Sequence, residues 1–275
     1  MRETIYKTDI PISIAHISDV HNMPPKSMIP SLRLHHPDII TITGDTVYGR
    51  IPDDGRSVLQ EQTYVIPFLE ECVRIAPTFL SLGNHEWVLD MEDLQVISST
   101  GVTVLDNSYT IFSRTVYSNG SAENKNIVIG GLTSGKVLVS RKLGSVHEVT
   151  PEIIEKNGLD DPELHWLDDY FKIPGYHLLL NHHPEYWPQL HAPPIDLCLS
   201  GHAHGGQWRF YNPLKHRMCG VYAPGQGFFP TLTEGMHDGR LVISRGLSNT
   251  VKLVPRFFNE IELVYVLPSK NGIWK

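Results

Sequence analysis

The chain has 275 residues, of which 41% are hydrophobic and 19% are charged, and its formal net charge is −7. This composition is typical of a globular protein, and the length predicts a single domain that spans residues 1–275. Proteins that bind nucleic acid usually carry a basic surplus or basic runs, so the acidic balance argues against nucleic acid as a partner.

Short, mostly apolar runs recur along the chain, and each is bounded by turn-forming or polar residues. Runs of this kind predict strands that are buried on both faces of a sheet. They cover residues 12–17, 39–43, 78–82, 176–180 and 196–199. The spacing of apolar residues predicts helices at 59–74, 90–99 and 162–171. Strands that alternate with helices predict a layered α/β fold.

Further strands are expected outside this pattern of alternating strands and helices. An Asn119-Gly120 turn signal lies between two runs and predicts a hairpin. These two runs and two more predicted strands cover residues 109–117, 127–132, 240–244 and 260–266. The stretch 135–158 has no clear pattern, and a surface loop is favoured there over a flap that covers a site.

The chain shows no sign of secretion or of membrane insertion. Its first apolar run is too short for a signal peptide or a span, and no later stretch could cross a bilayer. The three cysteines, Cys72, Cys198 and Cys219, form no C-x-x-C pair, which argues against a disulfide framework and a zinc ribbon. Cys72 and Cys198 lie in apolar patterns that predict small buried side chains. Together these features predict a cytoplasmic protein with free thiols.

An Asp, Asn or His residue follows each of the five buried runs. These residues are Asp19, His21, Asp45, Asn84, His85, His182, His202 and His204. In open α/β sheets, ligands bind at the edge where the carboxyl ends of the strands meet. The distribution therefore predicts one polar site at that edge.

The residue types favour divalent metal ions. Asp19 and His21 are two residues apart, so an extended backbone would point both side chains to the same side. The same spacing separates His202 and His204. Imidazole, carboxylate and amide groups together suit zinc, iron or manganese. Two such ions would exceed the charge of two carboxylates and a bridging hydroxide, so the site would attract a phosphate group.

The order of these residues resembles the five motifs of the calcineurin-like metallophosphoesterase family. The matching blocks are Asp19-Val20-His21, Gly44-Asp45, Gly83-Asn84-His85-Glu86, His182 and Gly201-His202-Ala203-His204. The resemblance runs from about residue 12 to residue 206, and it implies a four-layer α/β/β/α sandwich with two mixed sheets flanked by helices. The sequence HAHGGQ at 202–207 and the later Ser244-Arg245-Gly246 more narrowly resemble the bacterial YkuE/YaeI-type branch of phosphohydrolases.

The resemblance implies two divalent metal ions, which would be manganese, iron or zinc. By matching position, one ion would be held by Asp19, His21, Asp45 and His204, and the other by Asp45, Asn84, His182 and His202. Asp45 would therefore bridge the two ions. His182 is favoured over the adjacent His183, because Pro184 completes the family's His-x-Pro spacing.

The resemblance also implies the chemistry. Asp45 and His85 are the expected catalytic residues: a metal-bridging hydroxide would attack phosphorus without a phosphoenzyme, and His85 would bind the phosphate and protonate the leaving group. Asn84 and His85 are expected to contact the substrate. Arg245 could contact the phosphate or pair with a carboxylate, with equal weight. Glu86 is expected to support its neighbours rather than to bind metal.

These features predict hydrolysis of a phosphoester, with a phosphodiester favoured, in a phosphorylated small molecule or a nucleotide-type substrate. The alternatives are a phosphomonoesterase that acts on small metabolites and a metal-binding scaffold without catalysis. Tyr48 and Gly49 stand where protein Ser/Thr phosphatases carry Asp and Arg, which argues against that group. For the aromatic stretch 208–229, packing is slightly favoured over a pocket wall for an apolar leaving group.

Overall fold

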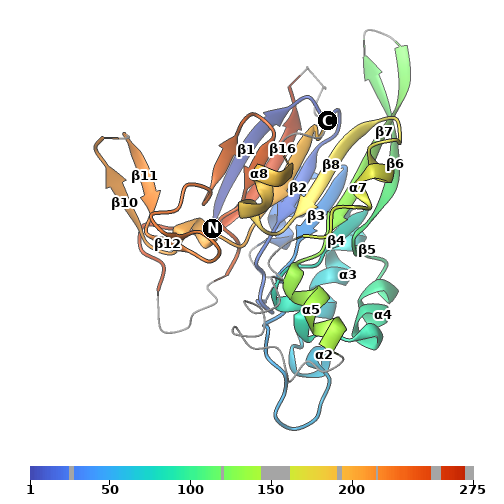
Figure 1. Cartoon of the computed structure of the whole chain (residues 1–275). Coiled ribbons are helices and arrows are strands. Elements are labelled where there is room, and N and C mark those ends of the chain that lie inside the picture. Colours follow the sequence, from blue (N-terminus) through green and yellow to red (C-terminus); the bar gives the residue numbers. More distant parts are fainter. Residues whose placement is uncertain are drawn as a thin grey trace.

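The computed structural model describes residues 1–24, 28–118, 121–143, 162–190, 194–214, 216–248 and 255–269. Two six-stranded sheets lie face to face, and helices cover their outer faces (Figure 1). This arrangement confirms the predicted four-layer α/β/β/α sandwich.

The first sheet has the strand order β1-β16-β2-β3-β4-β5. Its strands are β1 (Arg2–Thr8), β16 (Glu262–Pro268), β2 (Ile14–Ile17), β3 (Ile39–Thr43), β4 (Thr78–Ser81) and β5 (Thr103–Leu105). Strands β2 to β5 are parallel, and β16 pairs antiparallel with β2, so the sheet is mixed. The parallel strands bring the carboxyl ends of β2, β3 and β4 to one edge.

The second sheet has the strand order β14-β15-β9-β8-β7-β6. Its strands are β14 (Gly235–His237), β15 (Leu241–Ile243), β9 (Leu197–Ser200), β8 (Tyr176–Asn181), β7 (Ser121–Leu132) and β6 (Ser108–Ser118). The central strands β15, β9, β8 and β7 are parallel, and both edge strands are antiparallel to their neighbours. The predicted hairpin is confirmed as β6 and β7, with Ser118 opposite Ser121.

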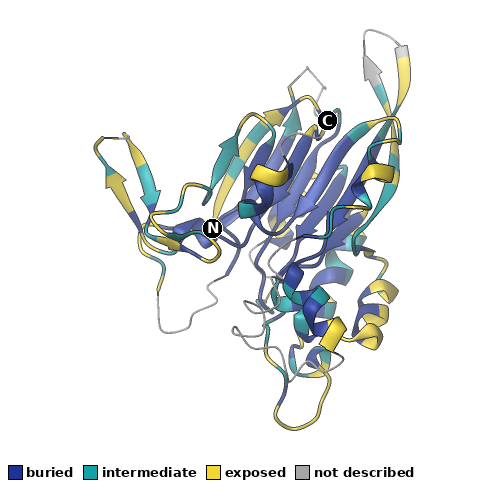
Figure 2. Ribbon diagram, viewed as in Figure 1, coloured by how far each residue is buried: buried dark blue, intermediate teal, exposed yellow. Residues whose placement is uncertain are grey.

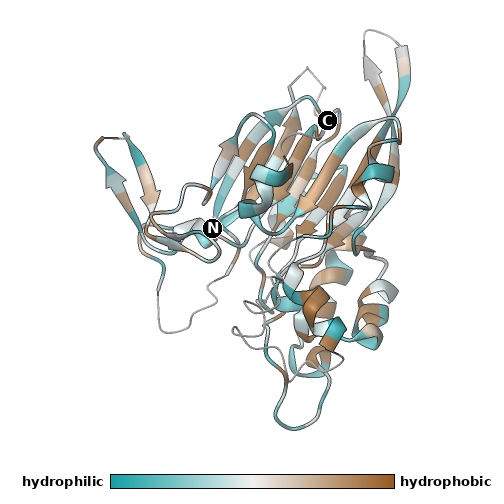
Figure 3. Ribbon diagram, in the orientation of Figure 1, coloured by the Kyte–Doolittle hydropathy of each residue, from teal (hydrophilic) through white to brown (hydrophobic). Residues whose placement is uncertain are grey.

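Three apolar cores separate the layers. Alternate residues of a strand point to opposite faces, so Ile39 joins the core between the sheets while Ile40 joins the core beneath the helices. The outer face of the first sheet is covered by α1 (Ile29–His35), α3 (Val65–Ile75) and α4 (Met91–Ser99), and that of the second sheet by α7 (Leu167–Tyr170) and α8 (Trp187–Leu190). The central strands of both sheets are buried and hydrophobic, whereas the helices expose one polar face (Figures 2 and 3). Cys72 and Cys198 are buried in these cores, as predicted.

Several predicted elements were wrong in extent. The helix expected at 59–74 is divided into α2 (Val58–Glu61) and α3, and Pro67 lies in the first turn of α3, where a missing N–H costs no hydrogen bond. The helix expected at 162–171 is shortened to α7. The loop expected at 135–158 begins instead with the helix α5 (Gly135–Leu143), and residues 144–158 lie outside the described residues.

Two small hairpins follow the second sheet's β9 and extend away from the sandwich (Figure 1). They are formed by β10 (Arg209–Asn212) with β11 (Arg217–Gly220), and by β12 (Tyr222–Ala223) with β13 (Gly227–Phe228). None of the helices in the described ranges is long and apolar enough to cross a bilayer.

Candidate metal centre

The predicted site residues gather where the carboxyl ends of strands from both sheets meet. They follow β2, β3 and β4 of the first sheet and β8 and β9 of the second sheet. Backbone hydrogen bonds join the loops: the Asp19 N–H donates to Gly44 O (3.3 Å) and the His21 N–H donates to Asp45 O (2.9 Å). The sandwich thus brings residues that are far apart in sequence into one buried cluster.

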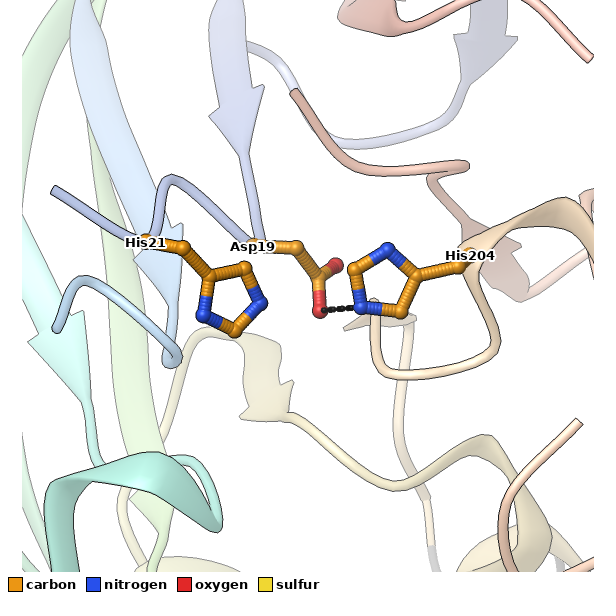
Figure 4. Close-up of side chains that lie close together, drawn as sticks. All are labelled: Asp19, His21 and His204. Atoms are coloured by element: carbon orange, nitrogen blue, oxygen red, sulfur yellow. Dashed lines mark ion pairs between the residues drawn. The ribbon is translucent and has the colours of Figure 1, made fainter. Parts of the chain in front are cut away.

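A first group of donors consists of Asp19, His21 and His204 (Figure 4). Their donor atoms lie within 4.8 Å of one another, and all three residues are buried. His204 Nε2 is 3.3 Å from Asp19 Oδ1, and the rings of His21 and His204 stack with their centroids 5.5 Å apart. Two imidazoles and a carboxylate at this spacing can hold one divalent cation.

A second group consists of Asp45, His182 and His202. His182 Nε2 is 3.2 Å from Asp45 Oδ2 and 3.1 Å from Asn84 Oδ1. Asp45 Oδ2 is also 3.7 Å from His21 Nε2, which belongs to the first group. The Asp45 carboxylate therefore stands between the two groups and can contact a cation in either.

The backbone reaches this arrangement through left-handed conformations, so the expectation of an extended backbone was wrong. Asp19, His21, Asp45, His202 and His204 all have φ between 45° and 63°. For residues other than glycine, each such conformation costs on the order of 1 kcal/mol, and such strain concentrates at functional sites. As a result, His202 and His204 do not share one side: His202 lies in the second group and His204 in the first.

Close packing of the loops adds a second constraint. A Cβ atom on Gly201 would lie 1.7 Å from Ser18 Oγ and 2.6 Å from Asp19 Oδ2. Only glycine allows the loop after β9 to approach the loop after β2 so closely. The glycine before His202 is therefore part of what places the two histidines beside Asp19.

Backbone carbonyls fix the orientation of two rings. His21 Nδ1 lies 3.1 Å from Val47 O, and His182 Nδ1 lies 2.6 Å from Thr43 O. Because a carbonyl only accepts, each Nδ1 carries a proton, and each Nε2 faces the Asp45 carboxylate. His21 Nε2 is buried and has no hydrogen-bond partner in the described part of the chain. An orphaned buried imidazole nitrogen that faces a carboxylate is an atom that a bound cation would complete.

The charges of the cluster also suit cation binding. Burial lowers the pKa of His21 and of His204 to about 3 each, and it lowers the pKa of His202 well below the ordinary value. Burial acts in the same direction on His182, but the Asp45 carboxylate raises the His182 pKa to about 10. Burial opposes ionisation of Asp45, yet His182 and His85 hold its pKa well below the usual range. Three neutral imidazoles are therefore available as ligands at neutral pH.

Glu86 ties the loops together, which gives the supporting role expected of it a definite form. Its Oε2 accepts hydrogen bonds from the backbone N–H groups of Asp45 and Gly83, at 2.8 Å each. Its Oε1 accepts from the backbone N–H and the hydroxyl of Thr46, at 2.7 Å each. One buried carboxylate thus connects the loop after β3 to the loop after β4.

Glu185 is a residue that sequence reasoning did not identify. Its Oε1 lies 3.0 Å from His183 Nδ1 and 3.5 Å from His202 Nε2. His183 also contacts Ser134 Oγ through Nε2, at 2.8 Å, so both of its ring nitrogens are engaged away from Asp45. His182, and not His183, lies beside Asp45. Only the position of Glu185 three residues after the favoured ligand could have drawn attention to it.

Two arginines of the C-terminal region, Arg245 and Arg256, have defined partners. The Arg245 guanidinium forms an ion pair with Glu234, which favours the carboxylate alternative over phosphate contact. Arg256, which sequence reasoning did not single out, places Nη2 2.9 Å from His204 Nδ1. Burial is the main cause that lowers the Arg256 pKa to about 10, so the side chain stays cationic at neutral pH.

The chain is similar to known metallophosphoesterases. It matches the calcineurin-like phosphoesterase family over residues 12–206. It is 27% identical to the uncharacterized metallophosphoesterase YkuE of Bacillus subtilis, and the 269 aligned residues cover 95% of this chain and 79% of YkuE. It is 25% identical to the uncharacterized metallophosphoesterase YkoQ of the same organism, over 87% of this chain and 77% of YkoQ.

A solved structure supports the same fold. The crystal structure of the calcineurin-like phosphoesterase YfkN from Bacillus subtilis superimposes with a TM-score of 0.53, at 15% identity, over 86% of this chain and 81% of that chain. The chain belongs to the calcineurin-like phosphoesterase family. It is a metal-dependent phosphoesterase, and its His and Asp groups could bind the metal.

Proposed function

We propose that the chain is a binuclear metallophosphoesterase that favours phosphodiesters of small molecules or of nucleotide type. One observation carries the proposal: the Asp45 carboxylate belongs to one three-residue donor group, and it also lies 3.7 Å from His21 of the other group. A site built for one ion needs only one such group. A shared carboxylate is the arrangement that holds two ions side by side.

In the proposed centre, each ion has its own set of residues. Asp19, His21, Asp45 and His204 would hold one ion, and Asp45, Asn84, His182 and His202 would hold the other. Manganese, iron and zinc all accept this mixture of imidazole and carboxylate. When bound, a pair of divalent ions lowers the pKa of water and neutralises charge on phosphoryl oxygens.

His85 is proposed to contact the phosphoryl group directly. Its Nδ1 accepts a hydrogen bond from the Gly49 N–H at 2.7 Å, so the proton of the neutral ring lies on Nε2. Nε2 faces the cluster, 3.9 Å from Asp45 Oδ2. The Nε2–H group can therefore donate to a phosphoryl oxygen, or pass its proton to a departing alkoxide.

The charge beside the site supports the preference for a diester. A phosphomonoester is a dianion near neutral pH, whereas a phosphodiester is a monoanion and needs fewer cationic contacts. Arg245 is held by Glu234, and His85 offers a neutral donor, so these two residues add no free positive charge. Arg256 beside His204 then supplies one cationic side chain, which matches the single negative charge of a diester better than the two of a monoester.

Hydrolysis of bis-p-nitrophenyl phosphate against p-nitrophenyl phosphate, by protein reloaded with manganese, tests the proposal. We expect a higher kcat/KM for the diester, and a fall of roughly a hundredfold in kcat for His85→Ala. His165→Ala, at an exposed position, is the matched control and should behave as wild type. A preference for the monoester would refute the diester assignment, and an active His85→Ala variant would refute the role of His85.

A further inference from the structure

An unusual number of large apolar side chains is exposed just beyond the metal centre. Among the described residues, the large apolar side chains that are exposed on the two small hairpins and on the segment before β16 are together called the aromatic patch. They are Trp208, Phe210, Tyr211, Leu214, Tyr222, Phe228, Phe229, Phe257 and Phe258. Phe228 is 74% exposed, Leu214 is 91% exposed and Phe258 is 81% exposed. Aromatic and leucine side chains at such exposure mark an interaction surface.

The segments that carry the patch are joined into one unit. The Arg209 N–H donates to Phe257 O (3.0 Å), the Val221 N–H donates to Trp208 O (2.8 Å), and the Phe229 N–H donates to Val221 O (2.8 Å). Ring contacts link Trp208 with Phe257 and Phe210 with Phe229, with centroids 6.3 and 6.2 Å apart. The aromatic side chains therefore project from a connected scaffold and not from separate loops.

This scaffold stands apart from the sandwich. The hairpin of β10 and β11 pairs with neither six-stranded sheet, and it projects from one side of the molecule (Figure 1). Both Phe210 and the adjacent Tyr211 are exposed, although neighbouring residues of a strand point to opposite faces. A two-stranded hairpin outside the main sheets is marginally stable in water, so this one is suited to gain stability from a partner.

Charge identifies the kind of partner. The whole chain carries −7, but residues 197–259 contain seven Arg or Lys residues against two acidic residues, Glu234 and Asp238. Arg209 and Arg245 pair with Glu234, whereas Arg217 is exposed on β11 and follows Lys215 closely in the sequence. An acidic protein that presents one basic, aromatic region is complementary to an anionic surface. Aromatic rings beside basic residues are the combination that settles at the headgroup level of an anionic bilayer.

We propose that the aromatic patch docks the protein on the surface of an anionic lipid bilayer. A second copy of the chain fits less well, because it would bring the same basic segments together. A polysaccharide also fits less well, because sugar sites pair stacking rings with free carboxylates, and the Glu234 carboxylate beside these rings is held by Arg209 and Arg245. Exposed phenylalanine and leucine instead gain free energy by entering the bilayer interface.

Vesicle flotation of the full chain tests the proposal. The probes are vesicles of phosphatidylcholine alone and vesicles with about 30% phosphatidylglycerol. We expect binding to the anionic vesicles, with a several-fold loss when salt rises from about 50 to about 500 mM. The double variant Phe228→Ser/Phe258→Ser should lower the partition coefficient by roughly tenfold or more.

A matched control keeps the test independent of folding. Leu34→Ser/Ile111→Ser removes side chains that are 75% and 48% exposed but lie on α1 and β6, and it should bind as wild type does. Thermal unfolding should be unchanged in both double variants. No flotation of the wild type, or an equal loss in both variants, would overturn the proposal. So would a wild-type dimer that dissociates in Phe228→Ser/Phe258→Ser, or binding to cellulose in place of vesicles.

Discussion

Replacement of Glu86 by glutamine tests whether one buried carboxylate holds the two metal-bearing loops together. The side chain is 1% exposed and accepts four hydrogen bonds, two on each oxygen. Glutamine has one acceptor oxygen. In its best orientation, that oxygen faces Asp45 and Gly83, the new NH₂ group donates to the Thr46 hydroxyl, and the Thr46 N–H is left without an acceptor.

The structure sets the size of the effect. A buried N–H without a partner costs about 1–3 kcal/mol, and hydrogen bonds to a charged group are worth more than those to a neutral one. We therefore expect Glu86→Gln to lower the free energy of unfolding of the metal-free protein by about 3 kcal/mol. Because the Asp45 loop loosens, metal affinity should fall by roughly ten- to a hundredfold.

Urea denaturation after treatment with a chelator measures the first effect, and calorimetric titration with manganese measures the second. Glu92→Gln is the matched control, since Glu92 is exposed in the first turn of α4. The control should stay within about 0.5 kcal/mol of wild type. A Glu86→Gln variant that matches the control in both assays would refute the reasoning.

Three further predictions concern the surroundings of the ligands. Gly49→Ala would place a Cβ 2.8 Å from Trp87 Nε1 and 3.1 Å from His85 Nδ1, so kcat should fall by roughly tenfold while manganese affinity, measured by calorimetry, stays unchanged. Glu185→Ala removes the carboxylate beside His202 Nε2, so one of two binding steps in the same titration should weaken by roughly ten- to a hundredfold. For His182, the pKa of about 10 lies above the ordinary 6.5, so its contribution to stability is present below pH 6.5 and is lost as pH rises towards 10. Thermal unfolding of chelator-treated protein should show this loss, and His182→Asn should remove it; a pH-independent wild type would contradict it.

The sequence predicted the parts of the fold that depend on burial and periodicity. Mostly apolar runs such as 39–43 are strands because both of their faces meet a core. The edge strand β1 was missed, because its buried and exposed residues alternate weakly and it pairs only with β16 at the other end of the chain. The boundary between α2 and α3 was missed, because the turn at Gln62 is set by its hydrogen bonds to Tyr48 and not by local propensity.

The same distinction applies to the site: local order predicted some of its residues, and contacts between distant segments determine the others. Residue order alone placed Asp19, Asp45 and His182 near one another, because parallel strands bring their carboxyl ends together. The partition of His202 and His204 between two groups followed only from the resemblance, since left-handed backbone angles override the period of a strand. Glu185 and Arg256 act through contacts between distant segments, and no local pattern marks them. Cytoplasmic location and single-domain organisation remain predictions.

Titration of the metal-free protein with manganese, followed by hydrolysis of bis-p-nitrophenyl phosphate, tests the central claim most directly. The two donor groups that meet at Asp45 predict that activity rises until two ions are bound per chain and then stays constant. Asp45→Asn should bind fewer ions and lose activity at every metal concentration. Full activity with one ion per chain, or hydrolysis that persists in excess chelator, would contradict a binuclear centre.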